Sequence, residues 1–565
     1  MKRFTRISAL FLSIAVTFPC ISPPAGECIN TKDYDFDFDN VEVDENNWEY
    51  IPTTNIATGE KSYSLWMYPI ADVSTLEIPA SYNGLEVTQV EVSNYDCEDY
   101  RINSLIFPDT ISDAYPQFEN IPTLKTLTFG SDEIHFDRNS YFRQTGIEEL
   151  SLPKIIPTEP AHTYNIDFRE NPELKRVIFR DSSDTITVGN EFFKDCPKLE
   201  EFVLPDTCKL LITEINSFSN TGLKKLDFSV ETDISSTSFA NCEALSSVTF
   251  RKKCKVGGNS FFNCHSLTDV TFEEPPTLTI HAFSGCDSLT NINIDTDFDF
   301  NGAGFSECPT LRSINSKNVF DETTGDFVPE YRDMIFRNFN AAQNTGFIND
   351  YIQAQIQKVI DENITPDMTD IQKLRIAHDW ICDNAIYAED EKFYNNPEYH
   401  TDASVFLNDI SVCEGYARAL NLFCHALGLP SCYVNSSSHA WVIVKLDGHW
   451  FHTDVTWDDY LHTINWFLCS DDELVKAGGA HSRWNIKKPS SMHDFQETEL
   501  PKCTCPMGDV NTDGKVGAAD LVTYSRFLLG AQDIPKDDII LSDMNYDGSY
   551  DSFDMVKLRK KAIRQ

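Results

Sequence analysis

Cys413, His439 and Asp454 are residues whose types and spacing could perform nucleophilic catalysis. Cys413 stands near the start of the segment SVCEGYARALNLFCHALGLP, where apolar residues then recur at helical spacing up to Gly428 and Pro430. The sequence therefore predicts a helix that begins at Cys413. Unpaired backbone N–H groups and the dipole at a helix start favour a thiolate over a thiol, and the thiolate is the nucleophile.

His439 and Asp454 lie in a predicted β-hairpin, HAWVIVKLDGHWFHTDVTWDD, with its turn at Asp447-Gly448. With that turn, the two residue numbers of each facing pair add up to 895. His439 and Asp454 then share one sheet face as diagonal neighbours, about 7–8 Å apart between backbones, which a carboxylate and an imidazole can bridge. The opposite face, predicted to pack against the core, carries Ala440, Val442, Val444, Leu446, Phe451 and Val455.

These three residues form a predicted nucleophile, base and orienter. Cys413 would attack an acyl carbon, His439 would take and return the proton, and Asp454 would hold the imidazole. The phrases SVCEGYARAL, HAWVIV and GHWFHTDVTWDD, in this order, resemble the transglutaminase-like, papain-related superfamily in its bacterial secreted variant. The resemblance implies an α+β domain with Cys413, His439 and Asp454 as the triad. Transglutaminases, proteases and peptide:N-glycanases all belong to that superfamily, so the acyl acceptor stays open.

Other residues near this site allow alternatives. A zinc site is conceivable, although no carboxylate or thiol stands at a recognised ligand spacing from the local histidines, His449, His452, His462 and His481. Trp441 and Trp457 flank the site, where they could pack the sheet or exclude water from an acyl-enzyme.

A repeated phrase, L-x-x-apolar-x-apolar, fills the region before this domain. Its first position recurs every 22 to 27 residues, at Ile102, Leu124, Ile147, Leu174, Leu199, Leu223, Leu245, Leu267, Leu289 and Leu311. That period is typical of a leucine-rich solenoid with one short strand per repeat. Five cysteines keep one phase and are predicted to form a ladder of buried thiols: Cys196, Cys242, Cys264, Cys286 and Cys308. The phrases resemble treponemal-type leucine-rich repeats of bacterial surface proteins, which implies the fold and, for function, only protein or surface binding.

The tail carries two calcium-loop patterns, DVNTDGKVGAAD from 509 and DMNYDGSYDSFD from 543. Each has Asp-x-Asn-x-Asp-Gly with a further Asp at position twelve, the EF-hand ligand set with Asp in place of Glu. The predicted ligands are Asp509, Asn511, Asp513, the Lys515 carbonyl and Asp520, and then Asp543, Asn545, Asp547, the Ser549 carbonyl and Asp554, with Asp551 acting through water. The sequence thus predicts two calcium ions in the tail and no cofactor for catalysis.

Each loop precedes one predicted helix, 521–529 and 555–563, and this pairing resembles the dockerin module of cellulosomal proteins. The resemblance implies a cohesin module of a scaffold protein as partner. The implied contact residues are Ala518, Ala519, Ser525 and Arg526 in the first unit and Ser552, Phe553, Arg559 and Lys560 in the second. The two sets differ in sequence, which argues against a symmetric binding mode, and Phe553 could equally pack in the core.

Composition and the first residues bear on the compartment. Lys plus Arg number 46 and Asp plus Glu 88, a formal net charge of −42, which disfavours nucleic acid and anionic membranes as partners. Residues 1–26 read as a secretory signal peptide, with a basic start and an apolar run of about a dozen residues, and Cys20 leaves a lipoprotein as an alternative. No later stretch reads as a membrane span. We therefore expect an extracellular, cellulosome-associated protein.

The expected fold class is multidomain: a leucine-rich-repeat β-solenoid, an α+β transglutaminase-like (papain-like) domain and a small all-α calcium-binding dockerin. The expected boundaries are 1–26 for the signal peptide, 40–330 for the solenoid with its N-terminal cap, 335–487 for the cysteine domain, 488–506 for a linker and 507–565 for the dockerin. Cys503 and Cys505 lie in that linker without an assigned role.

The leading functional hypothesis is a secreted cysteine enzyme that transfers or hydrolyses amide acyl groups of peptides or proteins, with a solenoid that could hold a protein or surface ligand. The alternative is a non-catalytic solenoid adhesin of the cellulosome whose cysteine domain is inactive. A polysaccharide-degrading enzyme would rest only on the partners that dockerins usually accompany, since no paired carboxylates stand out.

Overall fold

The structure is a computed structural model that describes residues 34–67, 73–94, 101–137, 139–156, 166–389, 397–482, 484 and 500–564. The predicted signal peptide over 1–26 lies outside the described residues. The chain divides into two compact units, Met1–Asp295 and Thr296–Gln565. Among the described residues, no helix is long and apolar enough to cross a membrane.

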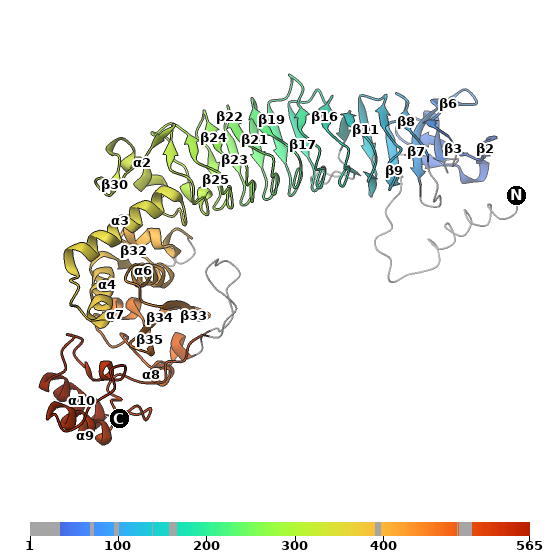
Figure 1. The fold of residues 1–565 in the computed structure, drawn as a ribbon. Coiled ribbons are helices and arrows are strands. Elements are labelled where there is room, and N and C mark those ends of the chain that lie inside the picture. The colour runs from blue at the N-terminus through green and yellow to red at the C-terminus, as the bar shows by residue number, and fades with distance from the viewer. Residues whose placement is uncertain are drawn as a thin grey trace. The chain divides into compact units, whose positions relative to one another are not determined.

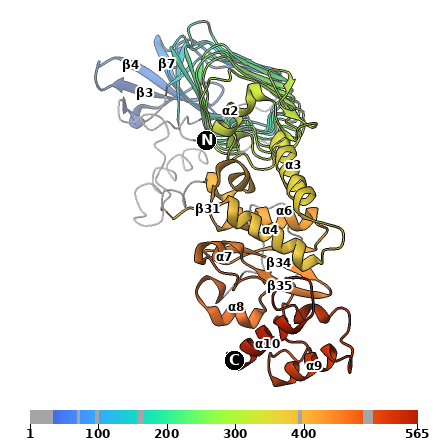
Figure 2. The ribbon, with the colours of Figure 1, turned by 90° about the vertical axis from the view of Figure 1, so that its left-hand side faces the viewer.

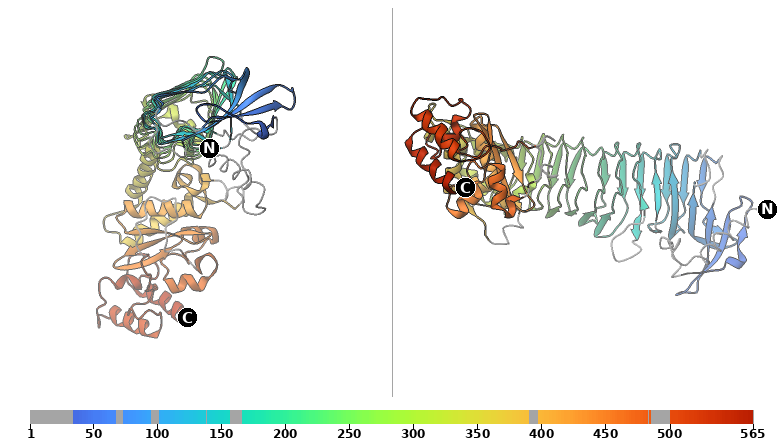
Figure 3. Two further views of the ribbon diagram at one scale, coloured as in Figure 1. Left: turned by 90° about the vertical axis from the view of Figure 1, so that its right-hand side faces the viewer. Right: turned by 90° about the horizontal axis from the view of Figure 1, so that it is seen from below.

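The first unit is a β-solenoid with an antiparallel start (Figure 1). β1 (Tyr34–Phe36), β3 (Glu49–Asn55) and β4 (Lys61–Met67) pair antiparallel, and β7 (Leu85–Ser93) then adds to β4 in parallel. From there one short strand follows another in parallel register, as Figure 3 shows in side view. One face is β17 (Thr185–Val188), β19 (Leu210–Thr213), β21 (Glu231–Ile234), β23 (Cys254–Val256) and β25 (Thr277–Leu278); another is β20 (Lys225–Phe228), β22 (Ser247–Phe250), β24 (Asp269–Phe272) and β26 (Asn291–Asn293).

The remaining strands of the first unit are equally short. They are β2 (Glu42–Val43), β5 (Thr75–Glu77), β6 (Ser81–Tyr82), β8 (Ser104–Phe107), β9 (Asp113–Glu119), β10 (Thr126–Phe129), β11 (Glu133–Phe136), β12 (Ser140–Arg143), β13 (Glu149–Leu152), β14 (Lys154–Ile156), β15 (Ile166–Asp167), β16 (Arg176–Phe179) and β18 (Glu201–Val203).

Two side-chain ladders fill the solenoid interior. Phe218, Phe239, Phe261 and Phe283 stack in sequence with ring centroids 5.2, 5.3 and 4.9 Å apart and nearly parallel planes. The predicted ladder of buried thiols is confirmed: all five cysteines are buried, free thiols. Four of them, Cys196, Cys242, Cys264 and Cys286, donate to a phenylalanine carbonyl of the preceding coil at 3.3 Å. The thiols therefore satisfy backbone groups that each coil exposes to the next.

In the second unit, helices pack on a three-stranded antiparallel sheet (Figure 2). The sheet is β33 (Ser431–Asn435), β34 (Ala440–Leu446) and β35 (His449–Thr453). The helices before it are α2 (Pro329–Asn338), α3 (Gly346–Asn363), α4 (Asp370–Asn384) and α6 (Cys413–Ala426); α7 (Val455–Leu461) and α8 (Asp471–Ala477) follow it. Thr369 caps α4 in a capping box with Gln372. Helix α6 packs against β34 and α4, so the sheet and α4 fix where α6 begins.

The predicted hairpin register is confirmed along the ladder. Val442 pairs with Thr453 and Leu446 with His449, so the paired numbers sum to 895 as expected. Asp447 and Gly448 take positive φ angles of 41° and 91°, as a tight two-residue turn requires. The prediction that Asp454 and Val455 continue the strand is wrong: β35 ends at Thr453, and Val455 begins α7.

Both faces of β34 are covered, and this changes the expected linker. Val434, Trp441, Ile443, Cys469 and Leu474 form a buried cluster on the face that carries Trp441. The same cluster contains Cys503, which is fully buried, and Leu500 packs against it. The described end of the predicted linker over 488–506 is thus part of the cysteine domain's core, because its apolar side chains complete a sheet face that would otherwise be exposed.

The tail folds as two loop–helix units around a small core. Val510, Val516, Tyr524, Ile534 and Leu558 form that core. The helices are α9 (Ala518–Leu528) and α10 (Ser552–Arg564), each starting three residues before the expected start. In α9 the early start is stabilised by Asp520, whose carboxylate accepts from the backbone N–H of Gly517 at 2.7 Å.

Candidate active site

Cys413 is the first helical residue of α6, as its sequence position predicts. The first turn of this helix is tightly packed: a Cβ on Gly415 would lie 2.0 Å from Ser411 Oγ and 2.6 Å from the Thr401 carbonyl oxygen. Glycine is therefore required there for α6 to approach the segment before it. Cys413 is 8% exposed, so reagents from solvent reach a small part of it.

His439 lies directly before β34 and links Cys413 to Asp454. Its Nε2–H donates to Asp454 Oδ2 at 2.6 Å, and the Cys413 thiol interacts electrostatically with the same ring. Because Nε2 is engaged by Asp454, Nδ1 is the ring nitrogen left for the thiol. Burial disfavours the imidazolium, but the charge and hydrogen bond of Asp454, with the contact to Cys413, raise the pKa of His439 to about 10.

Asp454 is the N-cap of α7 and is fully buried. Its Oδ1 accepts from the Trp457 backbone N–H at 3.1 Å, and its own N–H donates to the Trp466 carbonyl at 3.0 Å. Burial favours the neutral acid, yet the His439 charge and the hydrogen bonds of His439 and His481 lower the pKa of Asp454 to about 2. The carboxylate is ionised at neutral pH and fixed at both oxygens.

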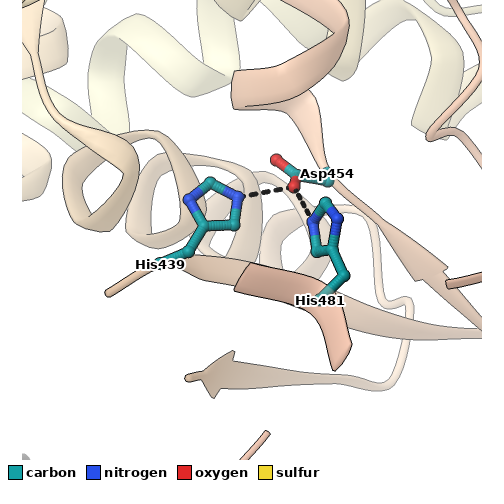
Figure 4. Close-up of side chains that lie close together, drawn as sticks. All are labelled: His439, Asp454 and His481. Carbon is teal, nitrogen blue, oxygen red and sulfur yellow. Dashed lines mark hydrogen bonds and ion pairs between the residues drawn. The ribbon is translucent and has the colours of Figure 1, made fainter. Parts of the chain in front are cut away.

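A second histidine contacts the same carboxylate, which the sequence reasoning missed. His481 Nε2–H donates to Asp454 Oδ2 at 2.6 Å, so one oxygen accepts a hydrogen bond from each of the two rings (Figure 4). His481 comes from the short 3-10 helix Gly479–Ser482, after α8. Only its place among the crowded histidines of this region signalled it, because no hairpin register relates it to Asp454.

Two clusters have side chains that could hold a metal ion, and their geometry favours hydrogen bonds instead. In the first, His439, Asp454 and His481, both N–O distances are 2.6 Å. Two ligands on one tetrahedral zinc lie about 3.3 Å or more apart, given zinc–ligand distances of about 2.0–2.2 Å. The observed distances are those of short N–H···O hydrogen bonds.

The second cluster is His452, Asp471 and Cys503. Trp441 Nε1–H donates to His452 Nδ1 at 2.9 Å, which assigns the proton of the neutral ring to Nε2. Nε2–H then donates to Asp471 Oδ1 at 2.9 Å and has no lone pair for a metal. Trp441 is thus a buried packing residue that also touches the His439 ring, with ring centroids 5.7 Å apart.

The two tail loops repeat one pattern of hydrogen bonds. Asp509 accepts from the backbone N–H groups of Asp513 and Gly514 at 2.9 and 2.8 Å, and Asp543 does the same for Asp547 and Gly548 at 3.1 and 2.9 Å. Four loop carboxylates are nearly or fully buried: Asp509, Asp520, Asp543 and Asp554. Among the described residues, none of the four has a Lys, Arg or His ion-pair partner.

That concentration of buried negative charge affects protonation. Burial, together with the charges of Asp554 and Asp547, raises the pKa of Asp543 to about 6 despite the backbone hydrogen bonds that oppose the rise. Burial, aided by neighbouring carboxylates, also raises the pKa of Asp509 and of Asp554. Oxygen ligands gathered around uncompensated charge are the donor set that a calcium ion takes.

Exposed apolar residues lie at equivalent positions of α9 and α10, 34 residues apart. Val522 and Val556 are both 53% exposed, and Leu529 and Ile563 are exposed as well. Phe553 is 69% exposed, so the reading that packs it in the core is wrong. The tail presents two similar apolar helix faces to solvent.

The fold and these sites define a three-part protein: a leucine-rich-repeat region, a transglutaminase-like domain and a dockerin. Family models match in that order. The BspA type leucine-rich repeat region matches in six copies over residues 90–215 and 212–325, the transglutaminase-like superfamily over 357–455 and the dockerin type I domain over 507–561. Cys413, His439 and Asp454 fall within the second match, whereas His481 lies beyond it.

Solved structures resemble the chain over about half of its length. The T. pallidum leucine-rich-repeat protein is 14% identical, with 50% of this chain and 88% of that one covered and a TM-score of 0.20. The pneumococcal vaccine antigen PcpA is 15% identical, with 54% and 97% covered and a TM-score of 0.23. No curated protein matches the chain.

Proposed function

We propose that this protein is a secreted cysteine enzyme that transfers or hydrolyses amide acyl groups of peptides or proteins. The observation that carries the proposal is the short bond from His439 to Asp454, with Cys413 at a helix start and in electrostatic interaction with the same ring. The raised pKa of His439 keeps its ring protonated at neutral pH, and an imidazolium stabilises a thiolate beside it. That pair supplies both a nucleophile and the proton that a leaving amine needs.

The reaction follows from these positions. The Cys413 thiolate attacks the amide carbonyl carbon, and the tetrahedral intermediate expels the amine as it takes the proton from His439. The acyl group is then a thioester on Cys413. Water or an acceptor amine attacks that thioester, His439 takes the proton of the attacking group, and the thiolate leaves. Asp454 keeps the imidazole oriented and its positive charge compensated throughout.

Surrounding groups favour the thioester over unwanted side reactions. Trp441 and Trp457 pack on the His439 ring, with centroids 5.7 and 5.8 Å away. Their rings remove water from the ring face and strengthen the imidazolium–carboxylate attraction. The choice between water and an amine as acceptor is the difference between a hydrolase and a transglutaminase.

The test compares wild type with Cys413→Ala on glutamine-donor peptides with an added amine and on unmodified protein substrates, with products identified by mass spectrometry. Cys424→Ala is the matched control, because Cys424 lies in the same helix, is fully buried, and has a pKa raised by burial to about 12. Deamidated, crosslinked or cleaved products should appear with wild type and the control but not with Cys413→Ala. Equal products from all three proteins would refute the enzyme.

The alternative is a non-catalytic cellulosomal adhesin that binds through its solenoid. A groove of about 350 Å³ on the β21–β25 face supports it, with Asp233 and Lys255 ion-paired at its wall. A slow, ordinary reaction of Cys413 with iodoacetamide near neutral pH would favour this alternative, whereas rapid labelling favours the enzyme.

We further propose that the tail binds two calcium ions and docks on a cohesin module. Asp509, Asn511, Asp513, the Lys515 carbonyl and Asp520 would hold one ion; Asp543, Asn545, Asp547, the Ser549 carbonyl and Asp554 would hold the other. The four buried carboxylates, which have no Lys, Arg or His ion-pair partner in the described part of the chain, support calcium, and the exposed apolar positions of α9 and α10 support a protein partner. The equivalence of Val522 with Val556 favours a symmetric binding mode. The sequence differences at the implied contact residues argue against that mode.

Chelation tests the calcium proposal. In the full chain, EDTA should lower the melting temperature of the tail's transition and abolish capture by an immobilised cohesin module. Excess calcium should restore both the melting temperature and the capture. A melting temperature that is the same with and without EDTA would contradict calcium binding. We place the protein outside the cell in a cellulosome, since a cohesin-bearing scaffold operates there; a role in polysaccharide breakdown would follow only from its neighbours in that assembly.

A further inference from the structure

His481 holds the same carboxylate oxygen as His439 but belongs to none of the motifs that defined the site. The Nε2 atoms of His439 and His481 each lie 2.6 Å from Asp454 Oδ2, and Figure 4 shows the two imidazoles converging on it. Oδ1 is occupied by the Trp457 backbone N–H at 3.1 Å. Three donors therefore fix a fully buried carboxylate, and it cannot rotate without breaking a short bond.

The surroundings of His481 are apolar. The ring is fully buried and lies among three tryptophan rings, Trp441, Trp457 and Trp466, with centroids 5.1, 4.3 and 4.9 Å away. Within the described part of the chain, its Nδ1 has no hydrogen-bond partner. Leucine or phenylalanine would fill such a site without burying an unsatisfied nitrogen, so packing alone does not account for a histidine here.

The proton positions follow from this arrangement. Because Nε2 must carry hydrogen to donate to Asp454, and because Nδ1 has no acceptor, the neutral Nε2–H tautomer of His481 is the one that fits. Among the described residues, the titratable groups around the cluster include Cys413, which interacts with His439, Cys469, which interacts with Asp454, and Asp458, whose backbone N–H donates to the Asp454 carbonyl. Asp458 is itself engaged by His378 and Thr463, at 3.2 and 3.0 Å, so it does not compete with Asp454 for the two histidine donors.

We propose that His481 is a positioning residue that locks Asp454 and thereby stabilises the imidazolium of His439. This inference rests on the proposed cysteine chemistry. With the carboxylate ionised and fixed, the imidazolium of His439 persists to a higher pH. Without His481, Asp454 loses one donor, its Oδ2 is no longer fixed toward His439, and the His439 imidazolium beside Cys413 is less stabilised.

The test measures the pH profile of Cys413 alkylation by iodoacetamide in the full, calcium-loaded chain, with the modified peptide quantified by mass spectrometry. In His481→Phe the acid limb should move up by about one pH unit, which lowers the rate constant about tenfold on that limb. His481→Gln, whose amide nitrogen can replace Nε2–H, should recover most of the shift. An unchanged limb in a folded His481→Phe protein would overturn the proposal.

A matched control separates positioning from general loosening. His452→Asn also removes a buried ring N–H bond to a carboxylate, on Asp471, and retains an acceptor for Trp441. Its acid limb should match wild type, and a shift as large as that of His481→Phe would refute a specific role. If His481→Phe does not fold, ring ¹⁵N spectra of wild type decide: a charged ring or an Nδ1–H tautomer at His481 overturns the proposal.

Failure of this inference differs from failure of the proposed function. If wild-type Cys413 itself alkylates like an ordinary thiol, without an acid-shifted limb, the cysteine chemistry and the role of His481 are both refuted. If wild type shows that limb and every His481 variant retains it, only the role of His481 is refuted.

Discussion

The cysteine domain contains two constellations of the same three residue types. One is Cys413, His439 and Asp454; the other is Cys382, His378 and Asp458, in which the thiol lies 4.0 Å from His378 Nδ1 and Asp458 lies 3.2 Å from Nε2. Both histidines are buried, and both have pKa values raised by carboxylates against the effect of burial. Residue types alone do not distinguish them.

Their helix positions do. Cys413 is the first residue of α6, where the helix dipole favours a thiolate, whereas Cys382 lies in the last turn of α4, where it disfavours one. His378 Nδ1 is also taken by Asp379 Oδ1 at 2.9 Å, so the ring nitrogen near Cys382 already has a better partner. Burial raises the pKa of the Cys382 thiol, and this outweighs the contact with His378. A usable triad therefore needs the right helix end and a free ring nitrogen as well as the right residues.

The largest effect is expected when each thiol is removed in turn. Cys413→Ala should abolish product formation, a loss of about 1,000-fold or more, because no other group can form the thioester. Cys382→Ala should keep turnover within about threefold and lower stability only slightly, since it removes a small buried side chain. Initial rates on the substrate found for wild type, with circular dichroism as the folding control, check this. Comparable losses from both variants would erase the distinction.

The second largest effect is expected to distinguish the two aspartates, Asp454 and Asp458. Asp454→Asn should reduce turnover by about 10³–10⁴-fold with the fold intact, because an amide cannot compensate the imidazolium or hold its tautomer. Asp458→Asn should mainly lower the melting temperature, since Asp458 supports His378, Thr463 and the Trp466 backbone N–H. Parallel kinetics and thermal melts would measure it; a turnover loss in Asp458→Asn equal to that in Asp454→Asn would count against the assignment.

Thiol reactivity compares the two constellations without any substrate. At pH 6.5, iodoacetamide should modify Cys413 about 100-fold faster than Cys382 in the same molecule, because Cys413 lies at a helix start whereas both nitrogens of His378, the ring near Cys382, already have carboxylate partners. Peptide mapping after timed quenches gives both rate constants at once. Equal rates, or faster labelling of Cys382, would contradict the helix-end argument.

Much of this could be predicted from the sequence, and two of the features that could not be predicted share one cause. The hairpin register and the start of α6 follow from local patterns, a two-residue turn and helical periodicity, and both match the structure. His481 and Cys503 did not follow, because each reaches the site or core from an irregular segment with no period. The helix start at Ala518 was also missed, since the capping carboxylate Asp520 was read only as a calcium ligand.

The smallest expected effect is on stability as a function of pH. The pKa of His439 rises from 6.5 to about 10 on folding, so its ion pair with Asp454 contributes fully below pH 6.5, and that contribution is lost as the pH rises toward 10. The melting-temperature difference between wild type and His439→Gln should therefore shrink by about 3 °C between pH 6 and pH 10. His378→Gln should follow the same direction, because carboxylates also raise the pKa of His378. A His439→Gln difference that grows with pH would mean that His439 is neutral in the folded protein, and the two constellations would then differ in charge as well as in helix end.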